Sequence, residues 1–161
     1  MPYLNIKLSG DMLSTQQRDA LFSRMTEMMA DSMKKRREVT VVSIELTDQA
    51  HWAVAGRTLT LSDRPAAYVD IKITGGTNSS EEKSAMIAGT TAVLQEIVRE
   101  IQTATYVVIH EIAADSWGYD GMTQASRRQI SPVLRAGFSR YYYEALHYLR
   151  LVLSQIGFRK C

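Results

Sequence analysis

The chain has 161 residues, of which 45% are hydrophobic and 22% are charged, and its formal net charge is +2. This length suffices for one domain with a proper core, or for two small halves that share one. Because positive and negative charges nearly balance, the composition does not favour a nucleic-acid-binding surface. The one cysteine is the last residue, Cys161, so an intramolecular disulfide is excluded and a reducing compartment is expected.

Signals for targeting, membrane insertion and metal binding are not recognisable. The chain begins Met-Pro and continues directly into an alternating segment, which does not fit a signal peptide. No uncharged apolar run approaches the roughly 18 residues of a membrane span. The three histidines are scattered and give no metal-ligand spacing with the terminal thiol. We therefore expect a cytoplasmic protein that binds no metal, membrane or nucleic acid.

The chain repeats itself at a spacing of 65 residues without a gap. Matching pairs include Tyr3/Tyr68, Ile6/Ile71, Lys7/Lys72, Gly10/Gly75, Ser14/Ser79, Thr40/Thr105, Trp52/Trp117 and Gly56/Gly121. A repeat defines the unit that folds. We predict a duplicated domain over residues 1–130, with copies at about 2–60 and 67–128 joined by a linker at 57–66.

Each copy is predicted to form a strand, a helix, a second strand and a hairpin. Apolar and polar residues alternate over 3–9 and again from Val69 to Ile73, which indicates half-buried strands. Ser14 and Ser79 begin capping boxes, so a helix should follow each. The helices are expected to bury the faces Leu21, Phe22, Met25, Met28, Met29, Met33 and Ile87, Thr91, Leu94, Val98, Ile101.

The second strands are predicted at about 39–46 and 104–112, where Val, Ile, Thr and Tyr are frequent. Parallel strands joined through a helix form a right-handed crossover. Two tandem β-α-β units therefore predict an α+β fold, a four-stranded sheet with two helices on one face. We expect subunit association to cover the other face, which carries Tyr3, Asn5, Lys7, Tyr68, Asp70 and Lys72.

Residues 131–161 lie outside the repeat and are predicted to form a C-terminal amphipathic helix. Ser131-Pro132 is typical of a helix start, and apolar residues recur at helical spacing from Leu134 to Ile156. We expect this helix to pack on the protein's own oligomer, with a membrane surface or another partner as the alternative.

The residue with the most distinctive chemistry is Pro2. Initiator methionine is normally removed before proline, which would leave a secondary amine at the start of a strand. An α-amino group has a pKa of roughly 7.7–8, and burial or nearby cations lower it. Such an amine can act as a general base near pH 7. The matching residue of the second copy, Ala67, is internal, so we expect one site per chain.

Several segments together resemble the tautomerase superfamily, in the pattern of a fused two-copy member like 4-oxalocrotonate tautomerase. They are PYLNIKL from Pro2, TVVSIE from Thr40, WAVAG from Trp52, YVVIHEI from Tyr106 and WGYDG from Trp117, and they span about residues 2–128. The resemblance implies β-α-β units, a catalytic amine at Pro2, no cofactor, and a homotrimer for a fused member. It places the aromatic pocket wall on Trp52 and Trp117.

Two arginines of that family are missing here. The loop arginine falls on Met12 or Thr77, and the strand arginine falls on Val41 or Tyr106. We predict that the Tyr106 phenol donates a hydrogen bond to an enolate oxygen, as oxyanion stabilisers do. The candidate cations for a substrate carboxylate are Lys72 and Arg57 first, with Lys7, Arg127 and Arg128 as further possibilities.

Three functions follow from the resemblance. The leading one is a tautomerase that interconverts keto and enol forms of a small 2-oxo or 2-hydroxy acid, with Pro2 as general base. The second is a haloacrylate hydratase or dehalogenase, or a decarboxylase, in which Glu111, His110 or Tyr119 would activate water. The third is a non-catalytic trimeric binding protein similar to macrophage migration inhibitory factor.

Overall fold

The computed structural model describes residues 2–10 and 13–129. The first copy consists of β1 (Tyr3–Ser9), α1 (Thr15–Asp31), β2 (Val41–Thr47), β3 (Ala53–Val54) and β4 (Arg57–Thr58). The second copy consists of β5 (Ala67–Thr74), α2 (Ser80–Val98), β6 (Tyr106–Ile112), β7 (Gly118–Tyr119) and β8 (Met122–Thr123). Three short helices complete the described chain: η1 (Arg37–Val39), η2 (Gln49–His51) and α3 (Gln124–Gln129). From α1 to β4, each element begins 65 residues before its counterpart, as the repeat predicts.

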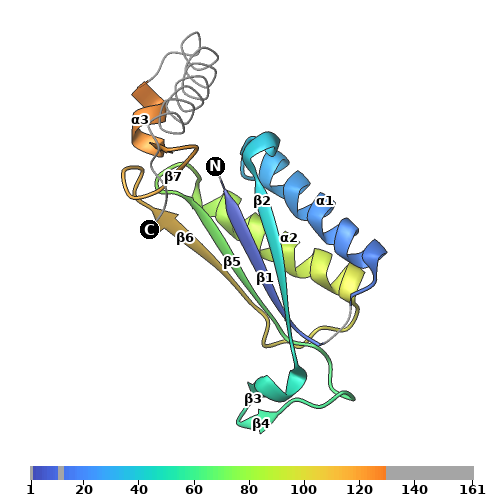
Figure 1. The fold of residues 1–161 in the computed structure, drawn as a ribbon. Coiled ribbons are helices and arrows are strands. Elements are labelled where there is room, and N and C mark those ends of the chain that lie inside the picture. The colour runs from blue at the N-terminus through green and yellow to red at the C-terminus, as the bar shows by residue number, and fades with distance from the viewer. Residues whose placement is uncertain (1, 11–12, 130–161) are drawn as a thin grey trace, which may run out of the picture.

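The four long strands form one sheet in the order β2-β1-β5-β6. β1 is parallel to β2 and β5 is parallel to β6, whereas β1 and β5 run antiparallel with Tyr3 opposite Lys72. Both long helices cover one face of the sheet (Figure 1). The predicted α+β fold is confirmed.

The antiparallel pair at the centre gives the sheet two different ends. We call the end where β1 starts and β5 finishes the Pro2 end, and the end where β5 starts and β1 finishes the Ala67 end. Figure 1 shows the N-terminus and β7 at one end and the β3–β4 hairpin at the other. The head of the first copy therefore lies beside the last residues of β5, which belong to the second copy.

The hydrophobic core lies between the sheet and the two helices. The strands contribute Leu4, Ile6, Leu8, Val69, Ile71 and Ile73, and the helices and following loops contribute Leu21, Met25, Met29, Met33, Met86, Val93 and Leu94, all buried. The methionine stripe of α1 is thus core packing, the usual use of a flexible side chain in an irregular interior.

The predicted buried face of α2 is partly wrong. Ile87 is 40% exposed and Thr91 is only partly buried, and the helix buries Met86, Thr90 and Val93 in addition to the predicted Leu94. Met86 and Ile87 are adjacent apolar residues, and only packing decides which of them faces the sheet. The helix also ends at Val98, because Arg99 adopts a positive φ of 66°.

Both helices begin with the capping boxes that the sequence predicts. Ser14 Oγ accepts a hydrogen bond from Gln17 N at 3.1 Å, and Ser14 N donates to Gln17 Oε1 at 3.1 Å. Ser79 and Glu82 make the same two bonds at 3.2 and 3.1 Å. These bonds satisfy backbone N–H groups that have no partner within the helix.

Each copy closes with a two-residue hairpin turn. Ala55 and Gly56 have φ values of 52° and 76°, and Asp120 and Gly121 have φ values of 51° and 70°. Two consecutive positive φ angles match the twist of antiparallel strands. β4 occupies 57–58, inside the range predicted as linker, and the second strands begin at 41 and 106, two residues later than predicted.

The predicted C-terminal helix at 131–161 lies outside the described residues. Within 2–10 and 13–129, no helix is long and apolar enough to cross a membrane.

Candidate active site

Pro2 lies immediately before β1 at the Pro2 end and is buried. Its carbonyl oxygen accepts a hydrogen bond from Val41 N at 3.3 Å, which ties it to the start of β2. Continuing the register of β1 and β5 by one residue places Pro2 opposite Ile73. The head of the chain is therefore held between two neighbouring strands.

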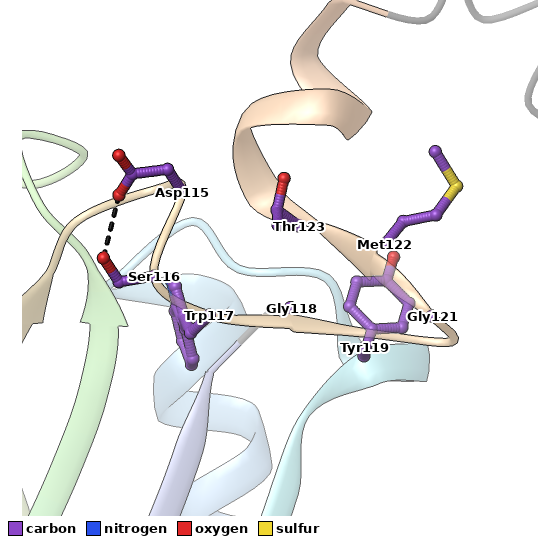
Figure 2. A pocket seen from close by; sticks show the side chains of 8 residues that line it. All are labelled: Asp115, Ser116, Trp117, Gly118, Tyr119, Gly121, Met122 and Thr123. Carbon is purple, nitrogen blue, oxygen red and sulfur yellow. Dashed lines mark hydrogen bonds between the residues drawn. The ribbon is translucent and has the colours of Figure 1, made fainter.

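Trp117 is attached to the strand beside Pro2. Its indole Nε1 donates to Thr74 Oγ1 at 3.2 Å, and Thr74 is the last residue of β5, next to Ile73. Figure 2 shows Trp117 at the start of the β7–β8 hairpin, in the wall of an open pocket of about 350 Å³. The pocket is lined by Asp115, Ser116, Trp117, Gly118, Tyr119, Gly121, Met122 and Thr123. Of the predicted aromatic residues, Trp117 is thus the one at the same end of the sheet as Pro2.

The hairpin that carries Trp117 is held against α3. The guanidinium of Arg127 lies 3.8 Å from the centroid of the Tyr119 ring, and its Nη2 donates to Tyr119 O at 2.7 Å. Nη2 is also 3.6 Å from Asp120 Oδ2. Arg127, a candidate cation for substrate, therefore already has partners within its own hairpin.

Gly118 is required for the close approach of β7 and β8. A Cβ atom at this position would overlap the carbonyl oxygen of Met122, so the backbone would have to move. Gly118 follows Trp117 directly, so a shift of this backbone would also reach the residue that carries the indole ring.

Tyr106 lies at the other end of the sheet. Tyr106 pairs with Tyr68 of β5, which in turn pairs with Lys7 of β1. Tyr106 is 66% exposed. Tyr68 and Ile73 are five positions apart on β5, which corresponds to about 16 Å along a strand. Within one chain the structure does not bring Tyr106 to Pro2, so only a neighbouring subunit could supply this phenol.

The β3–β4 hairpin lies at the Ala67 end (Figure 1). Trp52 directly precedes β3 and Arg57 begins β4, so both residues belong to this end. Trp52 O accepts a hydrogen bond from Leu59 N at 2.8 Å. Two nitrogens of Arg57 bind the Asp63 carboxylate at 2.6 and 2.9 Å. These bonds hold the pKa of Asp63 well below its usual range. Arg57 is therefore neutralised within its own copy and is distant from the Pro2 of the same chain.

Lys72 lies on the sheet face that the helices leave open. Its Nζ is 5.4 Å from the centroid of the Tyr3 ring, so it lies close to the Pro2 end but on that face. The same face carries polar pairs between neighbouring strands: Tyr3 OH with Ser43 Oγ at 2.9 Å, Asn5 Nδ2 with Glu45 Oε1 at 2.7 Å, and His110 Nε2 with Asp70 Oδ1 at 2.6 Å.

A lysine that the sequence analysis did not consider lies at the Pro2 end. Lys35 follows α1, and its Nζ donates to Thr77 Oγ1 at 2.8 Å. Thr77 is one of the two positions onto which the resemblance places the missing loop arginine. The lysine belongs to the first copy and the threonine to the second, so an alignment of the copies does not pair them. The available signal was the basic run 34–37, which has no equivalent at 99–102.

The electrostatics around Lys35 differ from those of an ordinary surface lysine. Burial lowers its pKa; the nearby Glu82 acts in the opposite direction, and Arg128 lowers the pKa further. Glu111 is held by Lys83 Nζ at 2.8 Å and by Gly76 N at 3.1 Å. The bond from Lys83 is the main reason that the pKa of Glu111 is lowered. A carboxylate engaged in this way is a weak base.

In the part of the chain that the structure describes, no three His, Cys, Asp or Glu side chains cluster in a way that could hold a metal ion.

Comparison with known proteins identifies the family of this chain. A family model described as tautomerase enzyme matches residues 2–61 and 68–125, one match for each copy. Probable tautomerase K2 of Dickeya dadantii (strain 3937) is 36% identical over 62 residues, 38% of this chain and 92% of that protein.

Two solved structures show the same fold. Pt0534 inactivated by 2-oxo-3-pentynoate has a TM-score of 0.69 at 18% identity, covering 80% of this chain and 99% of that one. The Q0 fused 4-OT wild-type symmetric trimer has a TM-score of 0.69 at 17% identity, covering 78% and 98%. With both copies matched by the family model and the fold shared with fused 4-OT proteins, the chain belongs to the tautomerase family.

Proposed function

We propose that this protein is a cofactor-independent tautomerase that interconverts the keto and enol forms of a small 2-oxo or 2-hydroxy acid. The catalytic group is the secondary amine of Pro2 after removal of Met1. The observation that carries the proposal is the position of Pro2, buried at the sheet end where Trp117 lines a pocket. Membership of the tautomerase family supports it.

The proposed reaction moves one proton and leaves the amine unchanged. Neutral Pro2 nitrogen accepts the hydroxyl proton of the enol as the carbonyl forms. The resulting ammonium then delivers a proton to the adjacent carbon, which gives the ketone. A buried amine suits this task, because its pKa falls towards neutral pH. A hydrogen-bond donor is needed to stabilise the negative charge that develops on the oxygen. Our candidate for this donor is Tyr106 of a neighbouring subunit.

A homotrimer is part of the proposal. β2 and β6 are the outer strands of the described sheet, and Val41 and Tyr106 on them are 44% and 66% exposed. Outer strands favour association through their edges. The open sheet face carries the polar pairs of Tyr3, Asn5 and Asp70. The symmetric trimer of a fused 4-OT protein with the same fold is consistent with this assembly. One amine per chain then gives three sites. A cytoplasmic location remains a prediction from the sequence.

The test begins with the intact mass of the protein, which should lack Met1. Ketonisation of phenylenolpyruvate is then measured for the native protein and for Pro2→Ala across pH 5–9. We expect the variant to be slower by about 10²–10⁴-fold, the usual contribution of a positioned proton-transfer group. At pH values below the pKa of the amine, the rate of the native protein should decrease, because the base is then protonated.

A second variant controls for the loss of the proline ring. A glutamate inserted between Met1 and Pro2 should keep Met1 in place and abolish activity while Pro2 itself is retained. Because a secondary amine adds to an activated alkyne, 2-oxo-3-pentynoate should modify Pro2 in the native protein and not in the inserted form. Retention of Met1 in the native protein, or equal rates with and without Pro2, would contradict the proposal and favour the non-catalytic binding trimer.

The hydratase or decarboxylase alternative has less support at this site. Its candidate base Glu111 is engaged by Lys83 and Gly76, His110 is bonded to Asp70 on the open sheet face, and the ring of Tyr119 is covered by Arg127.

A further inference from the structure

The two tryptophans at matching positions of the copies are held differently. Their backbones are bound in the same way. Trp117 O accepts a hydrogen bond from Gln124 N at 3.0 Å, and Trp52 O accepts one from Leu59 N at 2.8 Å. Trp117 is also fixed through its side chain, by the bond from Nε1 to Thr74 Oγ1 at 3.2 Å. Among the described residues, none accepts a hydrogen bond from the indole of Trp52. Within these residues the side-chain bond therefore occurs only at the Pro2 end.

Thr74 lies close to the head of the chain. It follows Ile73, which the register of β1 and β5 places opposite Pro2. Because the two strands run antiparallel, Thr74 lies on the side of Pro2 that carries its nitrogen. Thr74 is only 6% exposed. Its hydroxyl group therefore holds the indole of Trp117 at the nitrogen side of Pro2.

Thr74 is itself held by its neighbours. It pairs with Ile112 of β6, and its carbonyl oxygen accepts a hydrogen bond from Thr77 Oγ1 at 2.6 Å. Its side chain is branched at Cβ, so rotation about χ1 is restricted. The counterpart in the first copy, Ser9, is not branched, and its Oγ accepts a hydrogen bond from Ala66 N instead. The acceptor of the indole N–H is therefore a rigid group.

The direction of the indole N–H decides which atoms of Trp117 meet the pocket. The ring has one polar atom, Nε1, which can only donate. An N–H group that loses its acceptor on burial costs free energy. Because Thr74 satisfies this donor at the strand, the carbon atoms of the ring remain for the pocket of about 350 Å³ that Trp117 lines. The bond therefore keeps this wall apolar.

We infer that Thr74 is a positioning residue of the site, which holds the indole of Trp117 as an apolar wall for the conjugated part of the substrate. The inference rests on the proposed function, because it takes the amine of Pro2 as the reacting group. Thr74 acts through the orientation of Trp117 and not through a contact of its own with the substrate. Ser9, at the Ala67 end, should have no such effect.

The inference is tested with Thr74→Val, which has nearly the shape of threonine but lacks the hydroxyl group, and with Thr74→Ser, which retains it. Thr74→Val should lower kcat/KM for the ketonisation of phenylenolpyruvate by about 3- to 10-fold, the range for one neutral hydrogen bond. Thr74→Ser should lose less than about twofold, because the acceptor remains. Ser9→Ala is the matched control at the Ala67 end and should change kcat/KM by less than about twofold.

A double-mutant cycle shows whether Thr74 acts through the indole. In the Trp117→Phe background, which has no N–H group, Thr74→Val should change kcat/KM by less than about twofold. An equal loss in both backgrounds would mean that Thr74 acts by another route, and the inference would be wrong. NMR of the isotope-labelled protein follows the bond directly, with the Trp117 indole signal identified in Trp52→Phe. In Thr74→Val its proton resonance should move upfield and exchange faster with solvent, and an unchanged signal would also overturn the inference.

A binding measurement keeps this test separate from that of the catalytic proline. Phenylpyruvate is titrated by calorimetry into the Pro2→Ala protein, with and without Thr74→Val, which should weaken binding by about 3- to 10-fold. If both proteins bind phenylpyruvate equally well, the inference is wrong even where Pro2 proves catalytic. If Pro2 proves dispensable for the reaction but Thr74→Val still weakens binding, the positioning role stands and the proposed mechanism does not.

Discussion

The two ends of the sheet are built from the same repeated elements, yet they carry different chemistry. At the Pro2 end, the chain begins between β2 and β5, Thr74 Oγ1 binds the indole of Trp117, and Lys35 reaches Thr77. At the Ala67 end, the backbone continues through Ala66, whose N donates to Ser9 Oγ at 2.7 Å. Ser9 is the counterpart of Thr74, so the same hydroxyl position binds a side chain at one end and the connector at the other.

The difference shows how a duplication can complete one site and close the other. Each copy starts its first strand at one end of the sheet and has its hairpin at the other, because the two strands within a copy are parallel. Since β1 and β5 run antiparallel, the hairpin of the second copy lies at the end where the first copy starts. The connector between the copies removes a free chain end at Ala67, and three of its residues, Leu61, Asp63 and Pro65, line a pocket of about 250 Å³ there. The Ala67 end therefore has the same architecture, but Ala67 stands in place of Pro2 and Glu100 in place of Lys35.

The largest effect that would sharpen this comparison is expected from the two tryptophans. Trp117→Ala should lower kcat/KM for ketonisation by about 10- to 100-fold, which corresponds to about 1.4–2.8 kcal/mol of transition-state stabilisation. Trp52→Ala is the matched control at the Ala67 end and should change kcat/KM by less than about threefold. An equal loss in both variants would show that Trp52 reaches a Pro2 site of a neighbouring subunit.

The hairpins offer a second test of the comparison. Gly118 of β7 corresponds to Ala53 of β3, and only the glycine position is too tight for a Cβ atom. Gly118→Ala should lower the free energy of unfolding by about 1–3 kcal/mol and change the fluorescence of Trp117. Ala53→Gly should cost only about 0.5–1 kcal/mol, the backbone effect of glycine in a strand. Similar losses at both positions would mean that the two hairpins are equally tight.

The smallest effect concerns how the free energy of unfolding depends on pH through Glu111, which lies at the Pro2 end. The pairing with Lys83 lowers the pKa of Glu111 from its ordinary value of 4.5. A carboxyl group with a lowered folded-state pKa stabilises the fold above the unfolded value, and this contribution is lost as the pH falls below about 4.5. The difference in unfolding free energy between native protein and Glu111→Gln should therefore shrink between pH 6 and pH 3. Since Glu111 is partly exposed, the effect is small, and a difference independent of pH would contradict it.

Local patterns predicted most of the fold because they involve neighbours in the chain. The capping boxes at Ser14 and Ser79 and the alternation in β1 and β5 need only a few consecutive residues, and each is confirmed. The prediction of the buried face of α2 was less accurate, because adjacent apolar residues such as Met86 and Ile87 fit a helical stripe equally well. In the structure Met86 is buried and Ile87 is exposed.

The sequence by itself determined the repeat, the β-α-β order and the difference between Pro2 and Ala67 at the heads of the two copies. The tertiary structure decided which parts meet. The antiparallel contact of β1 with β5 brings Trp117, rather than Trp52, to Pro2 and separates Tyr106 from it by the length of a strand. The contact of Lys35 with Thr77 joins residues 42 positions apart in different copies. Periodicity in the chain specifies elements, but only strand direction and side-chain reach determine which elements share a site.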